Sequence, residues 1–194
     1  MSERSPAPGG LALVQSLVNT LDIESYADSL DGVEGRARFG IAENELEGAR
    51  ELRESLRAAL LAHAGHPPHR TVNPLGELLA RAPLVLTVDP ADGSAALVPA
   101  DGSPALVRGD GSASLAPGDG SAALARAVEV PLLSRVAAAV AQALVEGTWT
   151  RLKACEAADC HWAYYDRSPA GRGRWCSMQV CGARAKMRRY RAKA

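Results

Sequence analysis

The spacing of apolar residues predicts that the first 150 positions are mostly helical. A short apolar helix is expected around Leu11–Leu21. From about residue 42 to residue 63, Leu and Ala recur every three or four positions with Glu and Arg between them, which is typical of a helix with one buried face. Another helix is expected from Pro131 to Gly147. Its expected buried stripe consists of Leu132, Leu133, Val136, Val140, Ala143 and Leu144.

Between these helices the pattern changes from helical to β. A short helix is expected from Asn73 to Leu79, followed by a strand at 84–88 that reads LVLTV. Asp-Gly, a strong hairpin-turn signal, then recurs within a nine-residue repeat. The Asp-Gly-Ser copies lie at 92–94, 101–103, 110–112 and 119–121. The repeat is either a small β-meander or an expansion of one hairpin loop, and we expect an ordered first hairpin with weaker structure in the later copies.

Polar segments separate the expected elements. Residues 1–10 are expected to form a disordered leader, and residues 22–40 a loop. His63, His66 and His69 are evenly spaced and offer nitrogen ligands, but two prolines between the last two break any helical alignment. No matching ligand spacing accompanies them, so a solvated loop is favoured over a metal site.

The last forty residues have a different pattern, first aromatic and then basic. Residues 161–165 and 174–175 are short aromatic stretches, expected to pair as two strands joined by the loop DRSPAGRG. After Cys181 the spacing predicts a helix with one apolar face packed on the preceding segment. That expected face consists of Ala183, Met187, Tyr190 and Ala194.

The charge distribution divides the chain near residue 148. The formal net charge is zero, but residues 1–150 hold eleven Arg and nineteen acids, whereas residues 151–194 hold eleven Lys or Arg and three acids. A basic end of this kind is typical of a segment that binds an anion, most often nucleic acid. The cations expected to contact DNA are Arg172, Arg174, Arg184, Lys186, Arg188, Arg189, Arg191 and Lys193.

The N-terminal segment is too short and too polar for a signal peptide. No stretch approaches the roughly 20 apolar residues that a membrane-spanning helix needs. We therefore expect a cytoplasmic protein without a membrane partner, in which thiols stay reduced.

All four cysteines lie in the basic end and form two pairs. Four residues separate Cys155 from Cys160 and Cys176 from Cys181, and fifteen separate the pairs. Two converging pairs of thiolates are typical of a structural zinc site, although four-residue spacers are less common than two-residue ones. A redox or regulatory thiol set and chance are the weaker alternatives. We expect one zinc ion per chain, with no open position for a substrate.

The sequence therefore predicts an α+β protein. A mostly helical N-terminal domain with a β-hairpin or meander is followed by a small four-cysteine zinc finger with a C-terminal basic helix. The function expected first is DNA binding, and the alternative is a protein-interaction adaptor whose basic zinc module docks on an acidic surface. An enzyme is not expected, because no nucleophile–base pair, phosphate-binding loop or open metal site is visible.

The cysteine segment also resembles a known family. The run Arg174–Met178 (RWCSM), Cys181-Gly182 and the cations that follow resemble the CGNR zinc finger of bacterial proteins. In those proteins the larger N-terminal part is the ABATE domain, which the stretches LVNTLD and ARELRESLRAALL resemble more loosely. The resemblance places an ABATE-like domain at 11–147, including the repeats at 92–121, and the finger at 148–194.

The resemblance implies a stress-related transcription regulator. Its finger would bind DNA, and its N-terminal domain would sense a small ligand or regulate the finger. A homodimer and the identity of any ligand stay open. One position departs from the family pattern, because Ala183 stands where the family name has Asn. On the expected helix Ala183 lies on the apolar face, so the change is expected to alter capping or packing more than a base contact.

Overall fold

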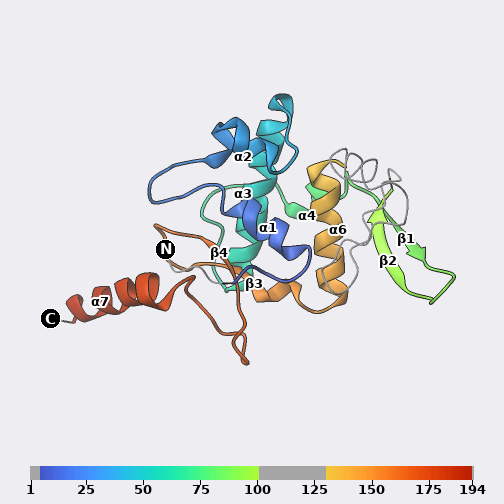
Figure 1. The fold of residues 1–194 in the computed structure, drawn as a ribbon. Coiled ribbons are helices and arrows are strands. Elements are labelled where there is room, and N and C mark those ends of the chain that lie inside the picture. Colours follow the sequence, from blue (N-terminus) through green and yellow to red (C-terminus); the bar gives the residue numbers. More distant parts are fainter. Residues whose placement is uncertain (1–4, 101–129, 194) are drawn as a thin grey trace.

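The computed structural model describes residues 5–100 and 130–193, and three helices form its centre (Figure 1). They are α1 (Leu11–Val18), α3 (Leu46–His63) and α6 (Leu132–Val145), and each contacts the other two. Their buried faces include Val14, Leu17, Val18, Leu52, Leu56, Leu60, Val136, Val140 and Ala143. Shorter described helices and helical turns are α2 (Val33–Ala37), α4 (Leu75–Leu79), Ser29–Asp31, Glu43–Glu45 and Trp149–Arg151.

The stripe predicted for α6 is wrong at its last residue. Val136, Val140 and Ala143 are each at most 5% exposed, whereas Leu144 is 59% exposed. Leu144 lies in the last turn of α6, where it is exposed together with its neighbour Val145.

Two segments expected to lack structure are folded. In the segment expected as a loop, Leu30 and Phe39 are buried in the core, and the Asp28 carboxylate caps the turn that follows by accepting from the Leu30 amide. In the expected disordered leader, Ala7 is 5% exposed and its amide donates to Gln15 Oε1 at 2.7 Å. Burial of these few side chains outweighs the polar composition around them, because each transfers apolar surface from water into the core.

The first predicted hairpin is present. β1 (Leu84–Val88) pairs antiparallel with β2 (Ala95–Pro99), and the first Asp-Gly-Ser copy forms part of the turn between them. The Asp89 amide donates to the Ser94 carbonyl at 2.7 Å, which closes that turn. Figure 1 shows this hairpin on one side of the molecule, beside α6, and the C-terminal helix on the opposite side. The later copies, at 101–121, lie outside the described residues.

A second small sheet joins the cysteine segment to the helical core. β3 (Leu152–Ala154) pairs antiparallel with β4 (Ala163–Tyr165) and packs on α3. The pairing expected between 161–165 and 174–175 is therefore wrong. Leu152, Ala154 and Ala163 belong to the same hydrophobic core as the three central helices. The packing of side chains thus continues across residue 148, where charge and cysteine content change.

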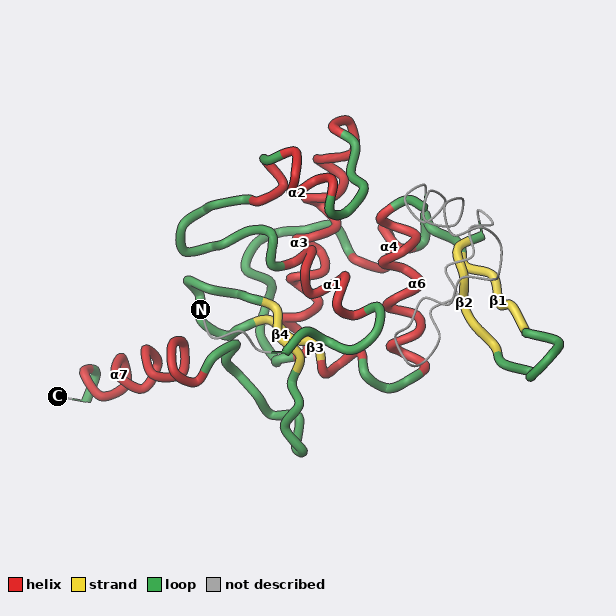
Figure 2. Tube along the Cα trace, in the orientation of Figure 1, coloured by secondary structure: helices red, strands yellow, loops and turns green. Residues whose placement is uncertain are grey.

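The architecture is α+β, as predicted. Figure 2 shows that, within residues 5–100 and 130–193, helix is more frequent than strand and the strands form two short antiparallel sheets. Among the described helices, none has the length and apolar character that crossing a membrane requires.

Candidate metal centre and basic helix

The first cysteine pair lies on a turn fixed to the core. Cys155 directly follows β3, and its amide donates to the Trp162 carbonyl at 3.0 Å. The amides of Cys160 and His161 both donate to the Ala157 carbonyl, which closes the turn between the two cysteines. His161 completes the turn with φ of 47°, a left-handed conformation that non-glycine residues adopt only where the surroundings hold them. Its Nδ1 lies 3.1 Å from the Cys155 carbonyl oxygen.

The second pair is arranged by a tight helical turn. Ser177 caps a π-helical turn, Met178–Gly182, by accepting from the Val180 amide at 3.3 Å. Cys181 lies within this turn, four residues after the cap and directly before the C-terminal helix α7 (Ala183–Arg191). A Cβ on Gly182 would lie 3.0 Å from Met178 Sδ, so the turn is tight at this point. The turn therefore links the second pair rigidly to α7.

The four sulfurs converge as a tetrahedral metal site requires. All of them lie within 4.8 Å of one another. Cys160 Sγ lies 3.6 Å from Cys176 Sγ, which in turn lies 3.7 Å from Cys181 Sγ. Four thiolates at about 2.3 Å from a tetrahedral zinc are separated by about 3.8 Å. A disulfide would require about 2.05 Å, and all four cysteines are free thiols. The geometry thus fits a metal ion.

The negative charges of four thiolates would also be stabilised by a cation between them. Hydrogen bonds from Cys160 and Cys176 lower the pKa of Cys155. The contact with Cys155 raises the pKa of Cys160, and it raises the pKa of Cys176 to about 12. Burial raises the pKa of Cys181. Four thiolates this close therefore repel one another unless a cation lies between them. Cys155, Cys160, Cys176 and Cys181 would together hold that ion.

Asp166 organises the loop between the two pairs. Its carboxylate accepts from Ser168 Oγ at 2.7 Å, from the Gly173 amide at 2.6 Å and from Lys153 Nζ at 3.2 Å. Burial alone would raise the pKa of Asp166, but these hydrogen bonds outweigh it and lower the pKa to about 2. A Cβ on Gly173 would lie 2.9 Å from the carboxyl carbon, so only glycine fits there. Asp166 thus holds this loop in its turn.

Arg57 anchors the first half of the finger to the helical core. Its side chain is fully buried and donates to the carbonyls of Val18, at 2.8 Å, and His161, at 3.1 Å. It also pairs with the buried Glu54 at 3.1 Å. Sequence reasoning missed this role, because it placed charged residues of this helix on exposed faces. Its spacing shows only that Arg57 lies three residues before the buried Leu60, and nothing nearby in the sequence indicates its partners.

Asn19 makes a second connection of this kind. Its amide nitrogen donates to the Ala163 carbonyl at 3.0 Å, and its oxygen accepts from the Ala163 amide at 2.7 Å. The side chain thus pairs with β4 as a neighbouring strand would. No sequence motif distinguishes Asn19 from an ordinary polar residue after a helix.

The three evenly spaced histidines are not a solvated loop, contrary to the expectation. His63 Nδ1 lies 2.8 Å from the Leu152 carbonyl oxygen, and its ring meets Trp149 edge-on. His69 Nε2 lies 3.1 Å from Glu54. Burial lowers the pKa of His63. They line the junction between core and finger but do not join a ligand set: within the described ranges, the four cysteines are the one metal-binding group of three or more side chains.

The helix α7 extends away from the rest of the molecule (Figure 1). The prediction that its apolar face packs inward is wrong, because Met187 is 51% exposed and Tyr190 is 72% exposed. Of its nine residues only Ala185 is buried. Ala183 is exposed at the first position of the helix, so the departure from the family's Asn does not alter packing.

The predicted DNA-contacting cations fall into two groups. Arg174 pairs with Glu156, and Arg184 lies 3.1 Å from Glu24 in the segment after α1. The remaining cations are exposed and have no ion-pair partner within the described part of the chain; these are Arg172, Lys186, Arg188, Arg189, Arg191 and Lys193. The structure thus brings five unpaired cations together on α7 and the residues directly after it.

Comparison with known families assigns both parts of the chain. A family model described as "Putative stress-induced transcription regulator" (ABATE) matches residues 11–147. The chain belongs to this family. The CGNR zinc finger model matches residues 151–194, which include the cysteine cluster and α7. No curated protein matches this ABATE chain. The family limits fall next to the change in charge, whereas the hydrophobic core spans both matched regions.

Proposed function

We propose that this ABATE protein is a bacterial transcription regulator that binds DNA through α7, with one structural zinc ion held by its four cysteines. The observation that carries the proposal is the position of α7, which stands in solvent and whose cations, apart from Arg184, have no acidic partner among the described residues. Phosphate groups supply the matching charge, and a helix of this diameter fits the major groove. Such a role places the protein with the chromosome, in the cytoplasm.

The cations differ in how readily they would contact phosphate. Within the described part of the chain no ion-pair partner is found for Lys186, Arg188, Arg189, Arg191 and Lys193. Arg172 is exposed in the finger loop. Arg174 and Arg184 already neutralise Glu156 and Glu24, so a phosphate would have to displace a carboxylate. We therefore assign the main phosphate contacts to the five cations of α7 and its end, and a smaller share to Arg172. These contacts position the helix and carry no base code.

The test is the salt dependence of binding. Anisotropy of a labelled duplex is titrated with zinc-loaded protein at several salt concentrations. Neutralising about five phosphates gives a slope of roughly −4.5 in log affinity against log salt. The paired substitution Arg188→Gln and Arg191→Gln is expected to make that slope about two units shallower. The matched control is Arg36→Gln with Arg70→Gln, which removes the same charge from the helical core. A flat salt dependence, or equal effects of both pairs, would contradict the proposal.

A second candidate is favoured by one observation. Met178, Met187 and Tyr190 are exposed apolar side chains beside the cations, as on a surface that docks on protein. The acidic first part of a second copy would then be a partner. Measuring the size of the protein assembly without nucleic acid, with and without a zinc chelator, distinguishes the adaptor function from DNA binding. Only the adaptor function predicts assembly that depends on zinc and needs no DNA.

A further inference from the structure

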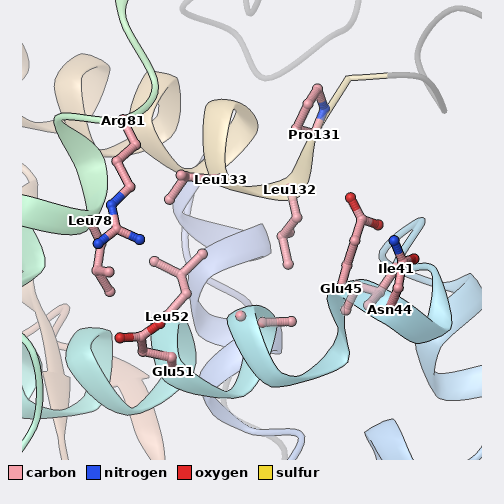
Figure 3. A pocket seen from close by; sticks show the side chains of 12 residues that line it. Ile41, Asn44, Glu45, Glu51, Leu52, Leu78, Arg81, Pro131, Leu132 and Leu133 are labelled. Atoms are coloured by element: carbon pink, nitrogen blue, oxygen red, sulfur yellow. The ribbon is translucent and has the colours of Figure 1, made fainter.

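A pocket lies in the helical domain, away from the cysteines and α7. It is formed between α3 and the start of α6, and it has a volume of about 270 Å³. Figure 3 shows Leu132 and Leu133 of α6 above the cavity and Leu52 of α3 below it. Arg81, just after α4, lies at one end, and the turn that carries Asn44 and Glu45 lies at the other.

The wall of the pocket is mainly aliphatic. Its apolar side chains are Ile41, Ala49, Leu52, Leu78, Leu132 and Leu133. An engineered apolar cavity of roughly 150 Å³ holds benzene, so this volume is enough for about ten non-hydrogen atoms. A mostly apolar cavity with a few polar groups is typical of small-molecule sites.

Three charged side chains line the pocket, and they differ in whether a described residue hydrogen-bonds to them. Glu45 accepts from the Ala42 amide at 2.9 Å, and Glu51 accepts from the Asn73 side chain. The Arg81 side chain is exposed and forms no hydrogen bond or ion pair with any residue that the structure describes. Its guanidinium lies beside Leu78 in Figure 3. A ligand with an anionic group at this end would supply the partner that Arg81 lacks.

Gly48 leaves the α3 side of the pocket open. It is the third residue of α3 and lines the pocket. A Cβ at Gly48 would have no atom within 4 Å, so packing within the described protein does not require glycine here. Its φ is not in the left-handed region, and alanine would strengthen the helix. The absence of a side chain leaves room for a ligand over the helix at this point.

We propose that this pocket binds a small apolar monocarboxylate, such as a straight-chain fatty acid of about eight carbons. The alkyl chain lies between α3 and α6 over Gly48, and the carboxylate pairs with Arg81. This inference goes beyond DNA binding, and its test uses no DNA. A failure of either proposal therefore leaves the other untouched.

The test is calorimetric titration of the zinc-loaded full chain with octanoate, octanol and octylammonium. Octanoate has ten non-hydrogen atoms, and its expected dissociation constant is about 0.1–1 mM with one site per chain. Octanol lacks the charge that pairs with Arg81 and is expected to bind about tenfold more weakly. Octylammonium is expected to bind more weakly than octanoate, because its cation cannot pair with Arg81.

Two variants with matched controls locate the site. Gly48→Leu fills the cavity and is expected to abolish octanoate binding, whereas Gly76→Leu changes another helical glycine with open space outside the pocket. Arg81→Met is expected to weaken octanoate about tenfold and leave octanol unchanged, whereas Arg70→Met changes an exposed arginine elsewhere. Gly48→Ala, which favours the helix, replaces Gly48→Leu in the test if that variant does not fold. It is expected to weaken octanoate binding without lowering the melting temperature.

Three outcomes would overturn the proposal. The first is that octanoate does not bind at concentrations up to about 10 mM, tenfold the upper expected dissociation constant. The second is that octanol binds as tightly as octanoate. The third is that the folded Gly48 variants bind octanoate with unchanged affinity. Loss of binding in the Gly48 and Arg81 variants alone, with both controls intact, supports it.

Discussion

The two halves of the zinc finger differ in how they are attached to the protein. The first half, β3 to β4 with the turn that carries Cys155 and Cys160, is built into the helical core through Leu152, Ala154 and Ala163. The second half, Cys176 to the end of α7, exposes Met178, Met187 and Tyr190 to solvent. The four sulfurs are the link between a buried hairpin and a projecting helix.

The difference separates two sources of stability. The hairpin is held by core packing and by Arg57 and Asn19, which need no metal. The nine-residue α7 has almost no buried surface, and isolated helices of this length are marginal in water. Small zinc modules generally fold on metal binding, but because the first half of this finger packs into the core, we expect only its second half to depend chiefly on the metal.

The largest expected effect is loss of the metal. Chelation, or Cys176→Ser, is expected to unfold the turn before α7 and the helix itself, while β3, β4 and α3 keep their amide protection. Hydrogen exchange measured by mass spectrometry, with and without chelator, checks this region by region. The matched control is Gln179→Ala, which changes an exposed side chain of the same turn but removes neither the cap nor a sulfur. Equal loss of protection in α3 and α7 would show that the two halves do not differ.

The next effect tests the attachment of the first half. Arg57→Met removes a buried charge, one of the donors to the Glu54 carboxylate and the donor to two carbonyls. We therefore expect the free energy of unfolding to fall by about 3–5 kcal/mol. Denaturant titration of the zinc-loaded protein measures this. Arg70→Met, at an exposed arginine, is expected to change stability by less than about 0.5 kcal/mol. A small effect of Arg57→Met would mean that the hairpin is held by apolar packing alone.

The pH dependence tests the same junction. Burial would raise the pKa of Glu54, but the hydrogen bond from His69 and the charges of Arg57 and Arg53 outweigh it and lower the pKa to about 2. A carboxylate with a lowered pKa stabilises the fold above its ordinary value of 4.5, and this stabilisation is lost as the pH falls toward 2. We expect the free energy of unfolding at pH 7 to be roughly 3 kcal/mol larger for the wild type than for Glu54→Gln.

That difference is expected to shrink between about pH 4.5 and pH 2. Comparing the two proteins at each pH by denaturant titration cancels the release of metal, which acid causes in both. Glu47→Gln, at an exposed carboxylate of the same helix, is the matched control. A difference that stays constant down to pH 2 would contradict the lowered pKa of Glu54.

Local patterns made much of this arrangement predictable. The apolar spacing of α3 and α6, the Asp-Gly turn after β1 and the cysteine pairs depend on residues close together in the chain. The core contacts of the finger do not. Arg57 and His161 are 104 positions apart, and Asn19 and Ala163 are 144 apart. The spacing of residues within one helix or strand carries no information on contacts between residues so far apart in the chain. The roles of Arg57, Asn19 and the histidines therefore could not be predicted.

The orientation of α7 was missed for a different reason. The sequence predicts its helix and its two faces, but a face packs only where another element supplies a surface. The second half of the finger is short, and its own core consists of the cysteines with Ala157 and Trp175. Too little apolar surface is left there to cover Met187 and Tyr190, so they stay exposed although their spacing is that of a buried stripe.

The smallest expected effect concerns these two residues. Met187→Gln with Tyr190→Gln is expected to change the free energy of unfolding by less than about 0.5 kcal/mol, because both side chains already face water. Thermal denaturation of the zinc-loaded protein, with Ala157→Gln as a buried comparison in the finger, measures the change. A loss of about 2 kcal/mol or more would mean that α7 packs against the protein in solution. Weaker DNA binding without loss of stability would instead place the apolar face of α7 against the nucleic acid.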